Sequence, residues 1–166
     1  MGEVDHSSGD SAEHVPVLVD EALRLLEPRP GETMLDATVG RGGHCAAIID
    51  RLAPNGRYIG LDVDPDNIGH VEQRFADPPV SLHLVRSNFG DAEAVLDELG
   101  VDGVDLLLAD LGFASSQLAD PSRGLSFNQD GPLDMRLDPS TETTAADLLA
   151  RLGERELADL IFRYGE

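Results

Sequence analysis

From Thr33 onward, short apolar runs alternate with segments that have the periodicity of amphipathic helices. Strands that alternate with helices along a chain are typical of a parallel β-sheet whose two faces are covered by helices. The alternation therefore predicts an α/β fold with a mostly parallel, doubly wound sheet. The expected strands are residues 33–37, 57–61, 80–85 and 104–109.

The predicted helices follow these strands. One covers about residues 44–52, where Cys45 has helical spacing with apolar neighbours and is expected to be a small buried side chain. Asp64 and Pro65 predict a capped helix start, and Thr144 predicts another. The last strand is almost wholly apolar, so we expect it to be a fully buried central strand. Residues 111–142 lack periodicity and are predicted to be a long functional or mobile loop.

Charge and hydropathy exclude several classes of protein. Twelve arginines, no lysine and 32 acidic residues give a net charge of -20. Such a chain repels polyanions at long range, which disfavours general coating of nucleic acid but leaves a local arginine-lined site open. No apolar run approaches the roughly 20 residues that a membrane span needs, and the polar start lacks a secretory signal. We therefore predict a cytoplasmic protein with no membrane partner and a disordered leader over residues 1–13.

A glycine-rich turn follows the first predicted strand, which ends at Asp36. Gly40, Gly42 and Gly43 would let the backbone turn sharply and approach a ligand, although such turns also end ordinary strands. Asp62 ends the next strand, about 20 residues beyond Gly42, where a carboxylate typically accepts the hydroxyl groups of a ribose. Together the turn and Asp62 predict a site for a nucleotide-like cofactor.

The turn favours S-adenosylmethionine over a nicotinamide dinucleotide. A dinucleotide fold requires a third glycine, and alanine occupies that place here. Asp36 is poorly suited to a pyrophosphate but well suited to a ligand that carries an ammonium and a sulfonium group. Asp110 ends the fourth strand, where it is a candidate acceptor for an N–H of an exocyclic amine during methyl transfer. The alternative is that Asp110 only caps a turn.

Eight segments, in the right order, carry a resemblance to a known family: 14–18 (HVPVL), 36–44 (DATVGRGGH), 61–65 (LDVDP), 87–89 (SNF), 110–112 (DLG), 123–127 (RGLSF), 130–136 (DGPLDMR) and 163–166 (RYGE). From about His14 to Glu166 the chain closely resembles the bacterial 16S ribosomal RNA cytosine-N4 methyltransferases of the MraW type. The most specific part is the loop from RGLSF to DMR, which a generic Rossmann-like fold would not predict.

The resemblance implies a Rossmann-like, S-adenosylmethionine-dependent methyltransferase sheet with the start of a helical insert. It implies a cofactor-binding core over residues 14–111, then a substrate loop and the beginning of the insert over 112–166. The implied reaction is methylation of the N4 amine of a cytidine in 16S rRNA of the small ribosomal subunit, without a metal. Members of this family continue beyond Glu166, so we expect an N-terminal portion. A homodimer is left open.

The resemblance also implies roles for single residues. Gly42, Gly43 and His44 would contact the methionine part of the cofactor. Asp62 would hold the ribose, Phe89 would flank the adenine, and Asp110 and Gln117 would complete the pocket. Candidates for the rRNA side of the cleft are His14, Arg123, Asp134 and Arg136. The alternative is that Asp134 and Arg136 pair with each other to shape the loop. The chain departs from the family at residues 113–119, which read FASSQLA instead of VSSPQLD.

Two other functions stay open on the sequence alone. The chain could be a non-catalytic module that binds S-adenosylmethionine. It could also be a small-molecule N-methyltransferase, which the net charge of -20 favours. Measurements of cofactor binding and of methyl transfer separate these readings.

Overall fold

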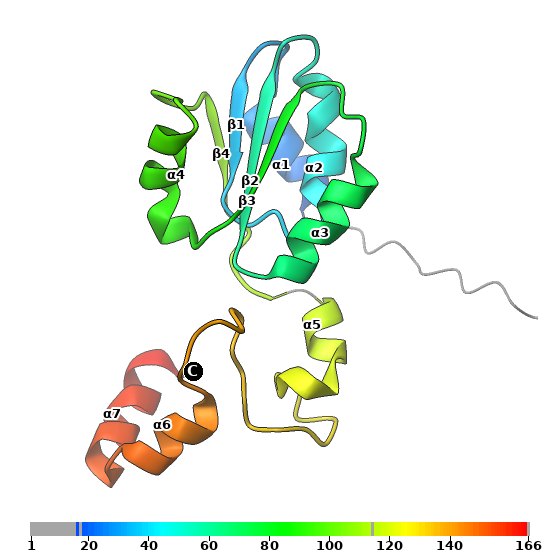
Figure 1. Cartoon of the computed structure of the whole chain (residues 1–166). Helices are drawn as coiled ribbons and strands as arrows, with labels where there is room; N and C mark the ends of the chain where they lie inside the picture. The colour runs from blue at the N-terminus through cyan, green and yellow to red at the C-terminus, as the bar shows by residue number, and fades with distance from the viewer. Residues whose placement is uncertain (1–15, 17, 114, 166) are drawn as a thin grey trace, which may run out of the picture.

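Four parallel strands form the centre of the protein. The computed structural model describes residue 16 and residues 18–113 and 115–165. The strands lie in the order β3-β2-β1-β4 and all pair in parallel (Figure 1). Their bounds are β1 Thr33–Asp36, β2 Arg57–Asp62, β3 Ser81–Arg86 and β4 Leu106–Leu108. The prediction of a parallel α/β sheet is confirmed.

The strand order has a reversal point beside β1. The chain builds outward from β1 through β2 to β3 and then returns to place β4 on the other side of β1. The order of the strands along the chain therefore reverses between β1 and β4. In open α/β sheets, ligands bind outside the carboxyl ends of the strands at this reversal point.

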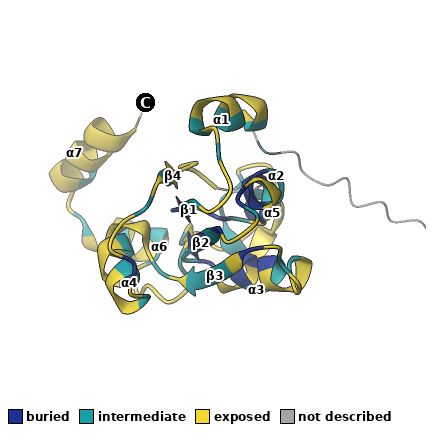
Figure 2. Ribbon diagram, turned by 90° about the horizontal axis from the view of Figure 1, so that it is seen from above, coloured by how far each residue is buried: buried dark blue, intermediate teal, exposed yellow. Residues whose placement is uncertain are grey.

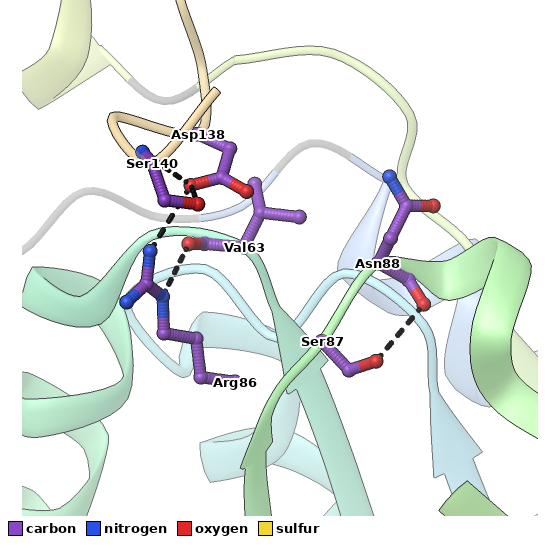
Figure 3. A pocket seen from close by; sticks show the side chains of 6 residues that line it. All are labelled: Val63, Arg86, Ser87, Asn88, Asp138 and Ser140. Carbon is purple, nitrogen blue, oxygen red and sulfur yellow. Dashed lines mark hydrogen bonds and ion pairs between the residues drawn. The ribbon is translucent and has the colours of Figure 1, made fainter. Parts of the chain in front are cut away.

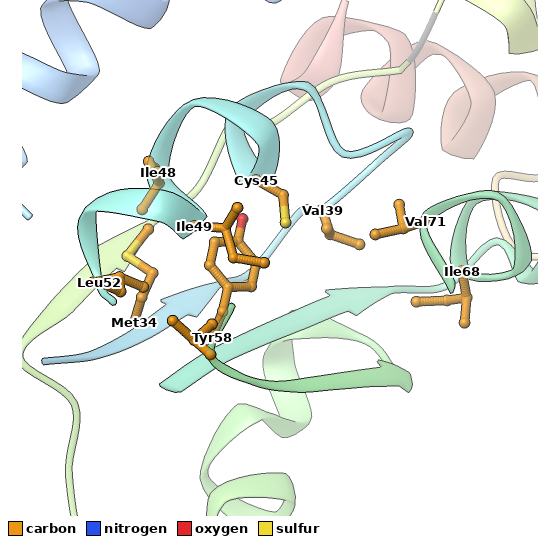
Figure 4. Close-up of a cluster of buried hydrophobic side chains, with 10 residues drawn as sticks. Met34, Val39, Cys45, Ile48, Ile49, Leu52, Tyr58, Ile68 and Val71 are labelled. Atoms are coloured by element: carbon orange, nitrogen blue, oxygen red, sulfur yellow. The ribbon is translucent and has the colours of Figure 1, made fainter. Parts of the chain in front are cut away.

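Helices cover the sheet on two faces (Figure 2). One face packs against α1 Val19–Leu26, α2 Gly43–Ile48, the short helix η1 Ile49–Arg51 and α3 Pro65–Arg74. Its buried cluster, drawn in Figure 4, includes Met34, Cys45, Leu52, Tyr58 and Val71. The opposite face packs against α4 Ala92–Glu98 through Leu35, Ile59, Leu61, Val95 and Val101. The alternation of side chains along β1 and β2 separates the two clusters.

The burial predicted for the fourth strand is wrong. β4 is a short edge strand in the described chain, and Leu107 is 58% exposed. Leu107 pairs in register with Leu35 but does not join the cluster under α4. An apolar run indicates side chains whose burial would be favourable. Whether they are buried depends on a neighbouring strand or helix, which the run does not specify.

The predicted loop over residues 111–142 contains two short helices, α5 Ser115–Ala119 and η3 Pro121–Arg123. The helices α6 Ala145–Arg151 and α7 Glu154–Tyr164 follow it, and the short helix η2 Phe89–Asp91 precedes α4. In Figure 1, α5, α6 and α7 lie below the sheet, beyond the end at which the chain leaves β4. The predicted helix starts are confirmed: Asp64 caps α3, and Thr144 forms a capping box with Asp147.

Two further predictions concern membranes and the leader. No helix within the described residues is both long and apolar enough to cross a membrane. The leader predicted over residues 1–13 lies outside the described residues.

Candidate functional site

Asp62 ties the end of β2 to the glycine-rich turn. Its Oδ2 accepts hydrogen bonds from the Gly40 amide at 2.9 Å and from Asn67 Nδ2 at 3.1 Å, and its Oδ1 accepts one from the Asp64 amide at 2.8 Å. A carboxylate has about four acceptor positions, so these three donors leave capacity for roughly one ligand hydroxyl. Burial raises the pKa of Asp62, and the three donors oppose that shift.

Asp36 holds the start of the same turn through a hydrogen bond to the Thr38 amide. It is buried, and its Oδ2 accepts a 2.5 Å hydrogen bond from the Tyr58 hydroxyl, while its Oδ1 accepts the Thr38 amide at 3.0 Å. Burial raises the pKa of Asp36. Both oxygens of Asp36 are thus engaged inside the protein, and its suitability for a cationic ligand stays a prediction.

Two glycines of the turn serve packing within the chain. Gly42 has φ +77°, and a Cβ there would lie 3.1 Å from a methyl group of Val71. A Cβ on Gly43 would collide with the ring of Pro16. Close packing within the chain therefore requires glycine at both positions, and contact of Gly42 and Gly43 with a ligand stays a prediction. A Cβ on Gly40 would meet only the Thr38 carbonyl, at 3.9 Å, and the Gly40 amide is held by Asp62.

His44 and Asp110 meet at the reversal point of the sheet. His44 is buried at the start of α2, and its Nε2 lies 3.6 Å from Asp110 Oδ2. The Asp110 amide donates to Thr38 Oγ1 at 2.7 Å, which joins the loops after β4 and β1. The Asp110 side chain is 54% exposed, so it remains accessible. His44 Nδ1 is buried with no hydrogen-bond partner among the described residues.

A pocket of about 230 Å³ lies beside the ends of β2 and β3 (Figure 3). Arg86 spans it, donating from Nε to the Val63 carbonyl at 3.2 Å and from Nη2 to Asp138 Oδ1 at 3.0 Å. Phe89 follows the pocket residue Asn88 and is about half exposed. The lining residues are Val63, Arg86, Ser87, Asn88, Asp138 and Ser140.

Gln117 and Arg123 converge on Asp64. Asp64 Oδ2 accepts Gln117 Nε2 at 2.9 Å and lies 2.7 Å from Arg123 Nη2. The Arg123 side chain is only 15% exposed. The guanidinium points inward to a buried carboxylate, and the role of Arg123 on the rRNA side of the cleft stays a prediction. Sequence reasoning assigned Asp64 only a capping role, and the aspartate pattern of residues 62–66 gave no sign of its distant partners.

Asp134 and Arg136 form a two-pronged ion pair within the loop. Arg136 donates to both carboxylate oxygens of Asp134, at 2.8 and 2.7 Å, which agrees with the structural alternative for these residues. These hydrogen bonds lower the pKa of Asp134 to about 2. His14, the remaining candidate for substrate contact, lies outside the described residues.

The fold and the site define an open, parallel α/β protein with a candidate ligand site at the reversal point of its sheet. Near this point lie the glycine turn, Asp62 and the His44–Asp110 pair. A family model described as the MraW methylase family matches residues 11–166, and the chain belongs to this family.

Individual proteins agree with the family match. The chain is 47% identical over 154 residues to "Ribosomal RNA small subunit methyltransferase H" of Nitratidesulfovibrio vulgaris, covering 92% of this chain and 43% of that protein. It is 45% identical to the protein of the same name from Desulforapulum autotrophicum, covering 93% and 49%. The chain thus spans about half the length of these curated relatives.

Solved structures include more distant likenesses. Fibrillarin of Aeropyrum pernix, described in complex with S-adenosyl-L-methionine, superposes with a TM-score of 0.47 at 23% identity. The superposition covers 63% of this chain and 46% of that one.

Proposed function

We propose that this chain carries the S-adenosylmethionine site of an enzyme that methylates the N4 amine of a cytidine in 16S rRNA, in the cytoplasm. The family match and the names of the curated relatives support this assignment. The observation that carries it is that Asp62 and Asp110 both bond to the loop after β1, Asp62 through the Gly40 amide and Asp110 through Thr38 Oγ1. We take residues 14–111 as the cofactor core and residues 112–166 as the segment that faces the substrate.

The residues present fit the adenosine end of the cofactor. Asp62 keeps acceptor capacity for a ribose hydroxyl at the end of β2. The pocket of about 230 Å³ includes Val63, which follows Asp62, and we assign the adenine to this side of the site. Phe89, which follows the pocket residue Asn88 and is about half exposed, is the apolar ring that we assign to flank the base. We assign Gln117 to the same site through Asp64.

The methionine end would lie against residues 42–44 and Asp110. When bound, S-adenosylmethionine supplies a methyl group on a sulfonium, which is the electrophile of the reaction. The unpartnered Nδ1 of His44 is buried in this region. A buried polar atom without a partner is costly, which favours a polar ligand or an ordered water beside it.

Asp110 is the proposed catalytic residue. The lone pair of a cytosine N4 amine is delocalised into the ring and is a weak nucleophile. As the N4–methyl bond forms and the methyl–sulfur bond breaks, the amine loses a proton to the Asp110 carboxylate. The exposed side chain of Asp110 can be reached by substrate, and His44 Nε2, 3.6 Å away, orients it. No step of this scheme requires a metal.

A small-molecule N-methyltransferase is the second candidate, and the arginines favour it. The Arg123 guanidinium is paired with Asp64, and the Arg136 guanidinium with Asp134. Both guanidinium groups would have to exchange a carboxylate partner in order to bind RNA phosphates. The net charge of -20 adds long-range repulsion. The third reading is a module that binds the cofactor without turnover.

One experiment separates the three functions. Isothermal titration calorimetry measures binding of S-adenosylmethionine, and a radiolabelled-methyl assay measures transfer to unmethylated small ribosomal subunits and to free cytidine. Binding with transfer to subunits supports the rRNA assignment. Transfer to cytidine alone favours the small-molecule enzyme, and binding without transfer favours the module. Absence of binding contradicts all three.

A further inference from the structure

We propose that Gln117 and Arg123 latch the segment after β4 onto Asp64 and thereby position Asp62 for the cofactor. The three residues, Asp64, Gln117 and Arg123, are called the Asp64 latch below. The inference rests on the proposed function in one respect, namely that the ligand of Asp62 is the ribose of S-adenosylmethionine. Arg123 then becomes a positioning residue that touches neither cofactor nor substrate.

Asp64 is built into the molecule as a buried acceptor. Its side chain is 2% exposed, and its Oδ1 accepts the Asp66 amide at 3.0 Å as the cap of α3. Its Oδ2 receives Gln117 at 2.9 Å and Arg123 at 2.7 Å. Removal of one partner from a buried ion pair leaves an uncompensated charge, which is much more destabilising than loss of an exposed pair.

A short chain of hydrogen bonds leads from the latch to the ribose carboxylate. The Asp64 amide donates to Asp62 Oδ1 at 2.8 Å, and Asp62 Oδ2 in turn accepts the Gly40 amide at 2.9 Å. Hydration of an unpaired Asp64 carboxylate would require the turn at residues 62–64 to open. That movement would shift Asp62 and loosen its hold on the glycine turn.

The segment that carries Arg123 is folded tightly around it. The Arg123 carbonyl accepts the Met135 amide at 3.0 Å, and Arg123 Nη1 donates to the Leu137 carbonyl at 3.3 Å. Gly124 has φ +63°, and a Cβ there would collide with the Pro132 carbonyl. These contacts join residues 132–137 to Arg123 and Gly124. The segment's other link to the core, Arg86 with Asp138, is more exposed and contributes less.

Thermodynamic linkage makes the latch testable in both directions. If the closed segment favours cofactor binding, bound cofactor must favour the closed segment by the same factor. Coupling of this kind typically changes affinity 5- to 150-fold. We therefore expect Arg123→Met to weaken binding about 10-fold, and cofactor to slow hydrogen exchange of the Met135 amide in the wild-type chain only.

The experiment compares four variants of the full chain with wild type. Calorimetry with S-adenosylhomocysteine is performed on Arg123→Met, Arg123→Lys, the double variant Asp64→Asn/Arg123→Met and the control Arg29→Met, which breaks an exposed pair with Glu27. Hydrogen exchange at Met135 is measured with and without the ligand. Arg123→Lys should bind with intermediate affinity, because lysine keeps the charge but lacks the planar fork. Arg29→Met should bind as wild type does.

The double variant protects the test against unfolding, because Asp64→Asn removes the buried charge that Arg123→Met alone would leave unpaired. It should fold and still bind weakly, whereas wild-type affinity in this variant or in Arg123→Met overturns the latch. Ligand-induced protection of Met135 that persists without Arg123 overturns it as well. If the wild-type chain binds neither cofactor nor product, the proposed function fails and the latch falls with it. If the wild-type chain binds the ligand and the Arg123 variants bind it with the same affinity, the latch is refuted and the proposed function stands.

Discussion

Replacement of Tyr58 by Phe should destabilise the protein through Asp36. The Tyr58 hydroxyl is fully buried and donates a 2.5 Å hydrogen bond to the buried Asp36 carboxylate, whose other oxygen holds the Thr38 amide. A hydrogen bond to a charged group contributes about 1.5–3 kcal/mol, and Phe supplies no replacement donor. We therefore expect the free energy of unfolding to fall by about 2–3 kcal/mol at neutral pH.

The assay is urea denaturation of wild type, Tyr58→Phe, Asp36→Asn and the double variant. With a slope of about 2 kcal/mol per molar urea, the midpoint should fall by roughly 1 M in Tyr58→Phe. A double-mutant cycle isolates the pair, because Asp36→Asn leaves no charge for Tyr58 to stabilise. Destabilisation by Tyr58→Phe below about 0.5 kcal/mol, or strict additivity in the cycle, would refute the reasoning.

The pH dependence of this loss has a defined sign. Burial raises the pKa of Asp36, whereas the Tyr58 hydrogen bond acts in the opposite direction because it favours the ionised carboxylate. The effect of Tyr58→Phe should therefore be largest above the folded-state pKa of Asp36. It should shrink as pH falls through that pKa and Asp36 becomes protonated.

Three further predictions test the site and the core. Asp62→Ala should weaken S-adenosylmethionine binding by one to two orders of magnitude, about what loss of a charged hydrogen bond costs, and wild-type affinity by calorimetry would refute the ribose contact. Asp110→Asn should lower the rate of methyl transfer by about 10² or more while cofactor binding changes far less, and an unchanged single-turnover rate would rule out Asp110 as the proton acceptor. Burial raises the pKa of Cys45 from 9.0 to about 12, so the unfolded chain loses this proton first. Stability should fall between pH 9 and 12 by about 1.4 kcal/mol per pH unit, and urea titrations of Cys45→Ala should show a shallower decline.

The sequence predicted the elements better than their surroundings. The four strands, the Asp64 and Thr144 caps and the burial of Cys45 all follow from local periodicity and capping chemistry, and the structure confirms them. Leu107 shows the limit of that reasoning: its apolar run marks a strand, but exposure depends on neighbours elsewhere in the chain. Helix α5 was missed because five residues are too few for a periodic pattern.

The candidate site divides in the same way. Parallel strands bring their carboxyl ends to one edge, so the sequence could predict that Asp62 and Asp110 lie near the glycine turn. It could not predict that Asp36 accepts a hydrogen bond from Tyr58, or that Arg123 turns inward to Asp64. A charged residue in a loop has the same sequence signature whether it faces RNA or a buried carboxylate.

By itself, the sequence determined the α/β class, the order of the elements and the family, because hydrophobic periodicity and short motifs are properties of neighbouring residues. Only the tertiary structure decided which polar groups meet. Tyr58 reaches Asp36 across 22 positions, and Gln117 reaches Asp64 across 53. Such pairs form because folding excludes water from Asp36 and Asp64, and buried carboxylates must then find donors wherever the chain supplies them.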